Sequence, residues 1–205
     1  EIDLYQERFD QRLSQAGMTG KYFIRQGEPA SALLEFSLLS DLLVLKLSHP
    51  PATSIVERIS HGIITILQQS RRPVLFVKEV PRVVSSILLP FDGGQRSKEA
   101  LYIAAYYAAR YACRLHLLLV MKGLDQDVVN RYYAQTYLER LGVKAEFHQG
   151  SSESLTADVV SLTETLSVST VILGGYENTS ILDRVFGQSI DEILSQVAVP
   201  VMICQ

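Results

Sequence analysis

The sequence predicts an α/β protein built on a parallel β-sheet with helices on both faces. Short, continuously apolar runs alternate with segments of helical length, and this alternation occurs in two parts of the chain. Apolar runs without polar positions are typical of parallel strands that are buried on both faces. Parallel neighbours need crossover connections, which are usually helical and right-handed. The order of the runs therefore predicts a doubly wound sheet.

Residues 83–205 carry this pattern in full, in the order βαβαβαβαβ. Apolar periodicity and turn residues place the expected strands near residues 83–90, 115–120, 143–148, 169–174 and 199–204. The expected helices between them are 97–112, 128–141, 155–166 and 190–194. We therefore expect this part of the chain to form a complete unit in which all the strands are parallel.

The first part of the chain repeats the later portion of the pattern. In both parts a helical run stops at a glycine, Gly17 or Gly142, and the apolar run after it stops at Gln-Gly, residues 26–27 or 149–150. A helix, a buried strand, another helix and a closing strand that begins with Pro-Val then follow in the same order. In the first part these elements are expected, after a helix at residues 2–15, at 21–27 (strand), 32–39 (helix), 41–45 (strand), 63–67 (helix) and 73–77 (strand).

The first copy begins only at the equivalent of the second helix, so it lacks two central strands. We expect residues 1–79 to form a partial, degenerate unit and residues 83–205 the complete one, with residues 78–82 as the linker. Leaving the edges and apolar faces of a partial sheet in water is costly. We therefore expect either that residues have been lost from the chain as given or that another chain fills the gap.

Association is expected through the two closing strands. Residues 73–77 and 200–204 are apolar, carry few charges and would lie at sheet edges, which tend to be paired. Two arrangements satisfy this expectation: self-association with another copy, or a pseudo-dimer of the two units of one chain.

The amino-acid composition limits which binding partners and which cellular compartment are expected. The net charge is −3, with 19 basic and 22 acidic residues interleaved along the chain, so no nucleic-acid partner is expected. The apolar runs are shorter than the ~18 residues of a membrane span, and the start lacks the basic residues of a signal peptide, which predicts no membrane insertion of this segment. Cys113 and Cys204 lie in apolar runs, which indicates free thiols in the cytoplasm.

A motif follows the first strand of the complete unit. Residues 87–97 read Ile-Leu-Leu-Pro-Phe-Asp-Gly-Gly-Gln-Arg-Ser: an apolar strand, Pro-x-Asp-Gly, and a serine that opens an alanine-rich helix. Together with the strand, glycine loop, helix and Pro-Val strand of residues 171–204, this pattern resembles the universal stress protein family. The resemblance covers residues 83–205 fully and residues 1–77 as a partial unit. It implies a flavodoxin-like fold of the adenine-nucleotide alpha-hydrolase type, with a five-stranded sheet in the order 3-2-1-4-5.

The resemblance also implies an adenine nucleotide, such as ATP, as the ligand. In this strand order a crevice lies between strands 1 and 4 at their carboxyl ends. The candidate contact residues are Pro90, Asp92, Val120, Leu173, Gly174, Gly187, Gln188 and Ser189. Asp92 could contact the adenosine or only form a turn and cap the next helix. The two glycines could cradle phosphates or only shape the loop.

Two positions depart from the phosphate loop of nucleotide-binding members, which reads Gly-x-x-Gly, nine residues, then Gly-Ser/Thr. Glu177 stands in place of the second glycine, and Gln188 stands in place of Ser/Thr. The added carboxylate and the longer side chain predict weak binding of phosphates or none. The corresponding loop of the first part, residues 46–61, has none of the motif glycines, so only the second unit is expected to bind.

No catalytic residue and no metal ligand is predicted. The four histidines show neither metal-ligand spacing nor a paired cysteine, and no pair of carboxylates is placed for acid–base chemistry. The sequence favours a stress-response or regulatory protein with a degraded nucleotide crevice, not an enzyme, and leaves weak nucleotide hydrolysis open. The alternative is a dimerisation or regulatory module that binds no nucleotide, such as the cytoplasmic domain of a transporter.

Overall fold

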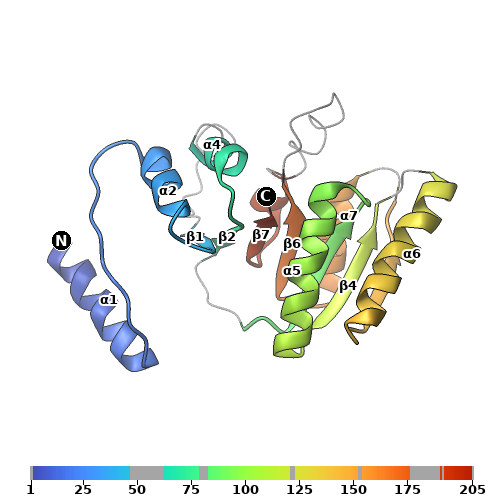
Figure 1. Cartoon of the computed structure of the whole chain (residues 1–205), viewed down its shortest axis with the longest axis horizontal. Helices are drawn as coiled ribbons and strands as arrows, with labels where there is room; N and C mark the ends of the chain where they lie inside the picture. The colour runs from blue at the N-terminus through green and yellow to red at the C-terminus, as the bar shows by residue number, and fades with distance from the viewer. Residues whose placement is uncertain are drawn as a thin grey trace.

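The computed structural model describes residues 2–46, 62–78, 83–120, 123–151, 154–175, 190 and 192–204. Within these ranges the strands form one seven-stranded sheet in the order β1-β2-β7-β6-β3-β4-β5 (Figure 1). The strands span Leu43–Lys46 (β1), Val74–Val77 (β2), Ser86–Phe91 (β3), Arg114–Leu119 (β4), Ala145–Gln149 (β5), Thr170–Gly174 (β6) and Val201–Cys204 (β7). The predicted α/β architecture is confirmed.

The strands after residue 83 reproduce the predicted topology. They are paired in the order β5-β4-β3-β6-β7, and every one of these pairs is parallel. Numbered along the second unit, this is the order 3-2-1-4-5. The observed strand ends lie within three residues of the expected ones. Every residue of β3 is buried, as continuous apolar character predicts for a central parallel strand.

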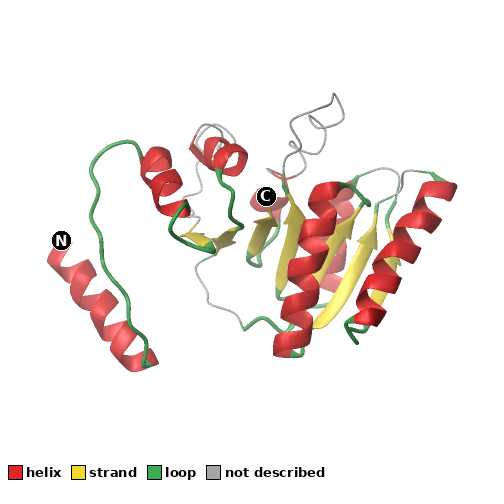
Figure 2. Ribbon diagram, viewed as in Figure 1, coloured by secondary structure: helices red, strands yellow, loops and turns green. Residues whose placement is uncertain are grey.

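Helices cover both faces of this part of the sheet (Figure 2). Helices α5 (Gln95–Tyr111) and α6 (Leu124–Arg140) lie on one face, and α7 (Leu155–Thr165) lies on the other (Figure 1). Residues 190 and 192–196 are also helical. None of the helices in the described parts of the chain is long and apolar enough to cross a membrane.

Each face of the sheet has its own hydrophobic core. On the α5 side, Ala100, Ala104 and Ala108 let the helix approach β3 and β4 closely, and all three are buried. On the other face, Val159 of α7 joins a cluster that also contains Phe76 of the first unit. Both Val159 and Phe76 are 0% exposed, so residues from before and after the predicted linker share one core on this face.

The first unit contributes α1 (Ile2–Ala16), α2 (Pro29–Ser37), β1, α4 (Gly62–Gln69) and β2. Helix α2 begins three residues before the expected start, because the Glu28 carboxylate accepts a 2.8 Å hydrogen bond from the backbone N–H of Ser31 and proline follows at the next position. Strands β1 and β2 pair in parallel, as the repeat predicts.

The two strands that were expected to mediate association pair with each other. Strand β2 pairs with β7 in antiparallel orientation, with Val74 opposite Ile203 and Phe76 opposite Val201. The predicted pairing of these strands therefore occurs within one chain, as an antiparallel joint between two sets of parallel strands. Division of the chain into units at residues 79–83 stays a prediction, since the strands of both parts belong to one sheet.

The strand expected at residues 21–27 does not form, and this prediction was wrong. These residues are extended but make no sheet pairing, and Phe23 and Ile24 are exposed. Ring contacts of 5.6 Å between Phe9 and Tyr22 and of 5.5 Å between Phe23 and Phe36 connect the segment with α1 and α2. The physical reason is that a strand needs neighbours, and the described residues of the first part of the chain supply none at this place.

Candidate functional site

Three strand ends meet at one edge of the sheet and define the candidate crevice. From β3 the chain goes outward to β4 and β5, and then returns to place β6 on the other side of β3. This reversal puts the carboxyl ends of β3 and β6 side by side, which is where open α/β sheets bind ligands. Asp92 and Val120 follow the ends of β3 and β4, and Gly174 ends β6. All three are half-buried.

Asp92 shapes the turn between β3 and α5. One oxygen of its carboxylate, Oδ1, accepts a 2.9 Å hydrogen bond from the backbone N–H of Gly94, the residue that caps α5. Ser97 closes the same turn, because its hydroxyl donates a 3.0 Å hydrogen bond to the oxygen of Gly94. The turn-forming role foreseen for Asp92 is therefore present, and the carboxylate remains half-buried at the crevice edge.

The buried side-chain amide of Asn130 supports this turn. Asn130, on α6, donates a 2.8 Å hydrogen bond from Nδ2 to the backbone oxygen of Asp92, and its Oδ1 accepts a 2.9 Å hydrogen bond from Gln126. Gly93 has a φ of 77°, and a methyl group on its Cα would collide with the Asn130 side chain. Asn130 therefore fixes the crevice wall, and Gly93 is needed both for its backbone angle and for the space.

Gly174 is required by packing at the other side of the crevice. A methyl group at this position would lie 2.8 Å from the backbone carbon of Arg96 and 2.8 Å from the backbone nitrogen of Ser97. The end of β6 thus lies directly against the first turn of α5. Close approach of two backbones accounts for this glycine without reference to a phosphate.

Comparison with known proteins identifies the fold of the chain. No family model matches the sequence, and no curated protein matches it. The structure matches a universal stress protein from Archaeoglobus fulgidus DSM 4304 with a TM-score of 0.78 and 17% identity, over 100% of this chain and 78% of that one. A protein from Pseudomonas aeruginosa UCBPP-PA14 described as a universal stress protein matches with a TM-score of 0.71 and 14% identity, over 100% of this chain and 78% of that one. The chain has the universal stress protein fold.

The universal stress fold brings together five of the residues that the sequence singled out. Pro90 and Leu173 are buried near the ends of β3 and β6, and Leu173 belongs to the hydrophobic core. The half-buried positions at the crevice are those of Asp92, Val120 and Gly174. The remaining candidates, Gly187, Gln188 and Ser189, lie outside the described residues, as does Glu177.

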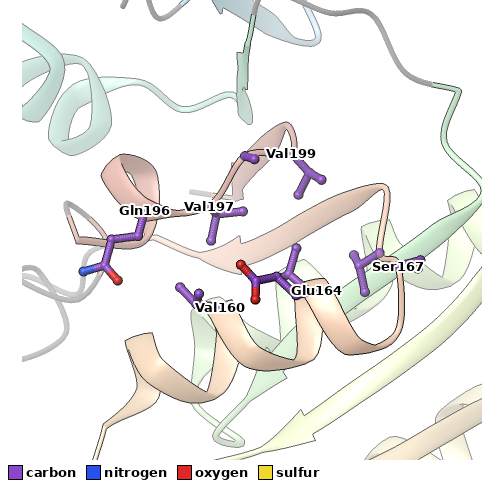
Figure 3. Close-up of a pocket in the computed structure, with 9 residues that line it drawn as sticks. Val160, Glu164, Ser167, Gln196, Val197 and Val199 are labelled. Carbon is purple, nitrogen blue, oxygen red and sulfur yellow. The ribbon is translucent and has the colours of Figure 1, made fainter. Parts of the chain in front are cut away.

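A cavity of about 310 Å³ lies at the opposite end of the strands from the candidate crevice (Figure 3). It is bounded by the last turns of α7, including Val160 and Glu164, by Ser167, and by residues 196–199 before β7. These segments precede β6 and β7, so the cavity lies at the amino ends of the strands, away from the crevice. The cavity and the candidate crevice therefore lie at opposite ends of the strands.

Proposed function

We propose that this chain is a regulatory protein of the universal stress class that binds an adenine nucleotide weakly at the switch-point crevice of its second unit. The observation that supports it is the placement of Asp92 and Val120 at the neighbouring ends of β3 and β4, opposite Gly174 at the end of β6. A half-buried carboxylate can accept hydrogen bonds from a ligand amino group. Val120 offers an apolar side chain beside it for a planar ring.

Weak binding is expected because two residues of the predicted phosphate loop disfavour phosphate. Glu177 would place a carboxylate beside the phosphates, and at ~6 Å from one phosphate charge it would cost about 3 kcal/mol at an effective dielectric of ~20, before salt or magnesium screens it. Even about a third of that weakens binding roughly fivefold. Gln188 removes a hydroxyl contact worth about 1 kcal/mol.

Binding without catalysis is part of the proposal. Among the described residues at the crevice, Asp92 carries the only ionisable group of the five candidates, and general acid–base or metal-assisted hydrolysis needs further groups around it. The β2–β7 pairing serves as the internal counterpart of a dimer joint. The buried free thiols of Cys113 and Cys204 support a reducing, cytoplasmic setting.

Titration calorimetry with ATP and Mg²⁺ tests the proposal. The wild type should bind weakly, and the double variant Glu177→Gly with Gln188→Ser should bind at least about fivefold more tightly. Asp92→Asn keeps the turn, since an amide oxygen can still accept from Gly94, but removes the charge; it should weaken binding in both backgrounds. Asp41→Asn, at an exposed position of the first unit, is the matched control.

Tight binding by the wild type would show that the loop tolerates Glu177. No binding by either protein would support the alternative function, a regulatory module without nucleotide. The close packing of Gly174 against α5 favours that alternative, because it explains the glycine without a ligand.

A further inference from the structure

Three side chains of types that can bind a metal ion lie close together on β4 and on the edge strand β5, away from the candidate crevice. They are His116 on β4 and Glu146 and His148 on β5. In the parallel pairing of these strands, His116 lies opposite Glu146 and Leu118 lies opposite His148. Residues two apart on a strand share a face, so Glu146 and His148 project to the same side of the sheet, next to the ring of His116.

The distances suit a common ion. Nδ1 of His116 lies 3.2 Å from Nε2 of His148 and 3.4 Å from Oε2 of Glu146, and the three ligand atoms all lie within 4.8 Å of one another. Two ligands that bind one tetrahedral ion at ~2.05 Å are about 3.3 Å apart. Two sides of the triangle already have this length. The third, between Glu146 and His148, is no longer than 4.8 Å, and the side chain of Glu146 is 67% exposed and so has room to adjust.

The ring of His116 is held with Nδ1 toward this cluster. The residue is 2% exposed, and its other nitrogen, Nε2, is buried without a hydrogen-bond partner among the described residues. Nδ1 contacts Nε2 of His148 and the carboxylate of Glu146. Two neutral imidazoles can share only one N–H between Nδ1 and Nε2. A bound ion would replace this hydrogen bond, with each ring carrying its proton on the nitrogen that faces away.

We propose that His116, Glu146 and His148 form a zinc site that links the edge strand β5 to β4. Two imidazole nitrogens and one carboxylate oxygen match the ligands that Zn²⁺ takes, with water in the fourth position. Mg²⁺ and Ca²⁺ prefer oxygen ligands throughout and fit this set poorly. The ion adds a side-chain link to the backbone pairing of β5, which among the described strands has a neighbour on one side only. The site is independent of the nucleotide crevice.

Metal titration of the chain without any affinity tag tests the proposal. Co²⁺ serves as the probe, because its visible absorption reports low-symmetry nitrogen and oxygen ligation, and Zn²⁺ is then added to displace it. Glu146→Gln and His148→Gln should each weaken binding by at least about tenfold, and the double variant should abolish it. Glu139→Gln, an exposed carboxylate near the end of α6, is the matched control and should bind as the wild type does. Mg²⁺ should not displace Co²⁺.

Thermal unfolding gives a second readout that needs no spectroscopic signal from the metal. Zn²⁺ should raise the melting temperature of the wild type and of Glu139→Gln, but not that of the Glu146→Gln/His148→Gln protein. Both substituted side chains lie on an edge strand and neither is fully buried, so this variant should fold, which far-UV circular dichroism checks. Equal zinc affinity of the wild type and the double variant would overturn the proposal, because the ion would then be held elsewhere, for example by His49 or His61. Absence of binding to the wild type at micromolar zinc would overturn it as well.

Discussion

The side-chain amide of Asn130 donates a 2.8 Å hydrogen bond to the backbone oxygen of Asp92, and this contact joins helix α6 to the turn that follows β3. Asn130 is 5% exposed, and its own oxygen is held by Gln126. The crevice wall therefore depends on a residue 38 positions away in the sequence. A buried amide with both ends bonded is costly to remove, because its partners are left without a hydrogen bond.

Asn130→Ala should destabilise the protein by about 1–3 kcal/mol, since the oxygen of Asp92 loses its donor and a small void is left. Urea unfolding followed by circular dichroism measures this. Gln135→Ala, which removes an exposed amide from the same helix and its 2.8 Å bond to Glu139, should cost less than about 0.5 kcal/mol. Equal effects of the two substitutions would show that the Asn130 contact adds nothing to stability.

Gly93→Ala should destabilise by about 1–2 kcal/mol through its positive φ alone, and further through the collision with Asn130. The second contribution can be isolated with a double-mutant cycle. In the Asn130→Ala background the cost of Gly93→Ala should fall, because the colliding side chain is gone. If the cost is the same in both backgrounds, the backbone angle explains all of it.

The parallel sheet could be predicted because each strand and helix carries its own local signal. Continuous apolar runs mark β3, β4, β6 and β7, and this signal does not depend on the neighbours. The strand expected at residues 21–27 shows the limit of such reasoning: Lys21 to Gln26 have the pattern of a strand, but pairing depends on a partner that the pattern cannot supply.

The crevice was predictable only in part, for a similar reason. Asp92 and Gly174 belong to short motifs at strand ends, so sequence and topology place them together. Asn130 gave no signal, because an asparagine in a polar helix looks like a surface residue until the helix is packed. His116 and His148 are 32 positions apart, and only the register of β4 with β5 makes them neighbours.

Ser169→Ala should be among the more damaging small substitutions. Its hydroxyl oxygen accepts hydrogen bonds from the backbone N–H groups of Ser85 and Ser86, at 2.9 and 3.0 Å, and donates to the oxygen of Ser86 at 2.8 Å. Alanine removes the acceptor of the two N–H groups next to a fully buried strand, whereas the oxygen of Ser86 keeps its 3.0 Å bond from the backbone N–H of residue 169. A loss of about 2–4 kcal/mol is expected. Ser195→Ala, whose hydroxyl bonds at an exposed position, is the control. Guanidinium unfolding of both proteins decides; a loss below about 1 kcal/mol for Ser169→Ala would contradict the prediction.

Alkaline pH should destabilise the fold. Burial raises the pKa of Cys204 from 9.0 to about 12, and the hydrogen bond with Tyr102 together with burial raises that of Tyr133 from 10.0 to about 12. The unfolded chain therefore releases these protons first, so their stabilising effect is complete below pH 9 and is lost as the pH rises from 9 toward 12. Burial lowers the pKa of Lys78, so the folded chain releases this proton first and this group alone would make the fold more stable as the pH rises.

Stability measured by urea unfolding at pH 8, 9 and 10 tests this directly. Tyr102→Phe removes the 2.7 Å hydroxyl contact with Tyr133 and should make the decline shallower, as should Cys204→Ala. A free energy of unfolding that stays constant or rises over this range in the wild type would show that Lys78 outweighs the thiol and the phenol.

The β2–β7 joint should make the two units unfold together. Phe76, 0% exposed, lies opposite Val201 across this joint, so Phe76→Ala should cost about 3–5 kcal/mol. Intrinsic tyrosine fluorescence, to which α5 and α6 contribute, and circular dichroism should then report the same lowered midpoint. Val44→Ala, on β1 at a position 56% exposed, should shift it little. Two separate transitions in Phe76→Ala, with the later one at the wild-type midpoint, would show that the units are independent.

The antiparallel joint also decides which way the two units face. Since β2 runs opposite to β7, the carboxyl ends of β1 and β2 lie at the same edge of the sheet as the amino ends of β6 and β7. The strand ends beside Asp92 and the carboxyl ends of β1 and β2 therefore lie at opposite ends of the strands of the sheet. A ligand that contacts one set of carboxyl ends therefore lies a full strand length away from the other set.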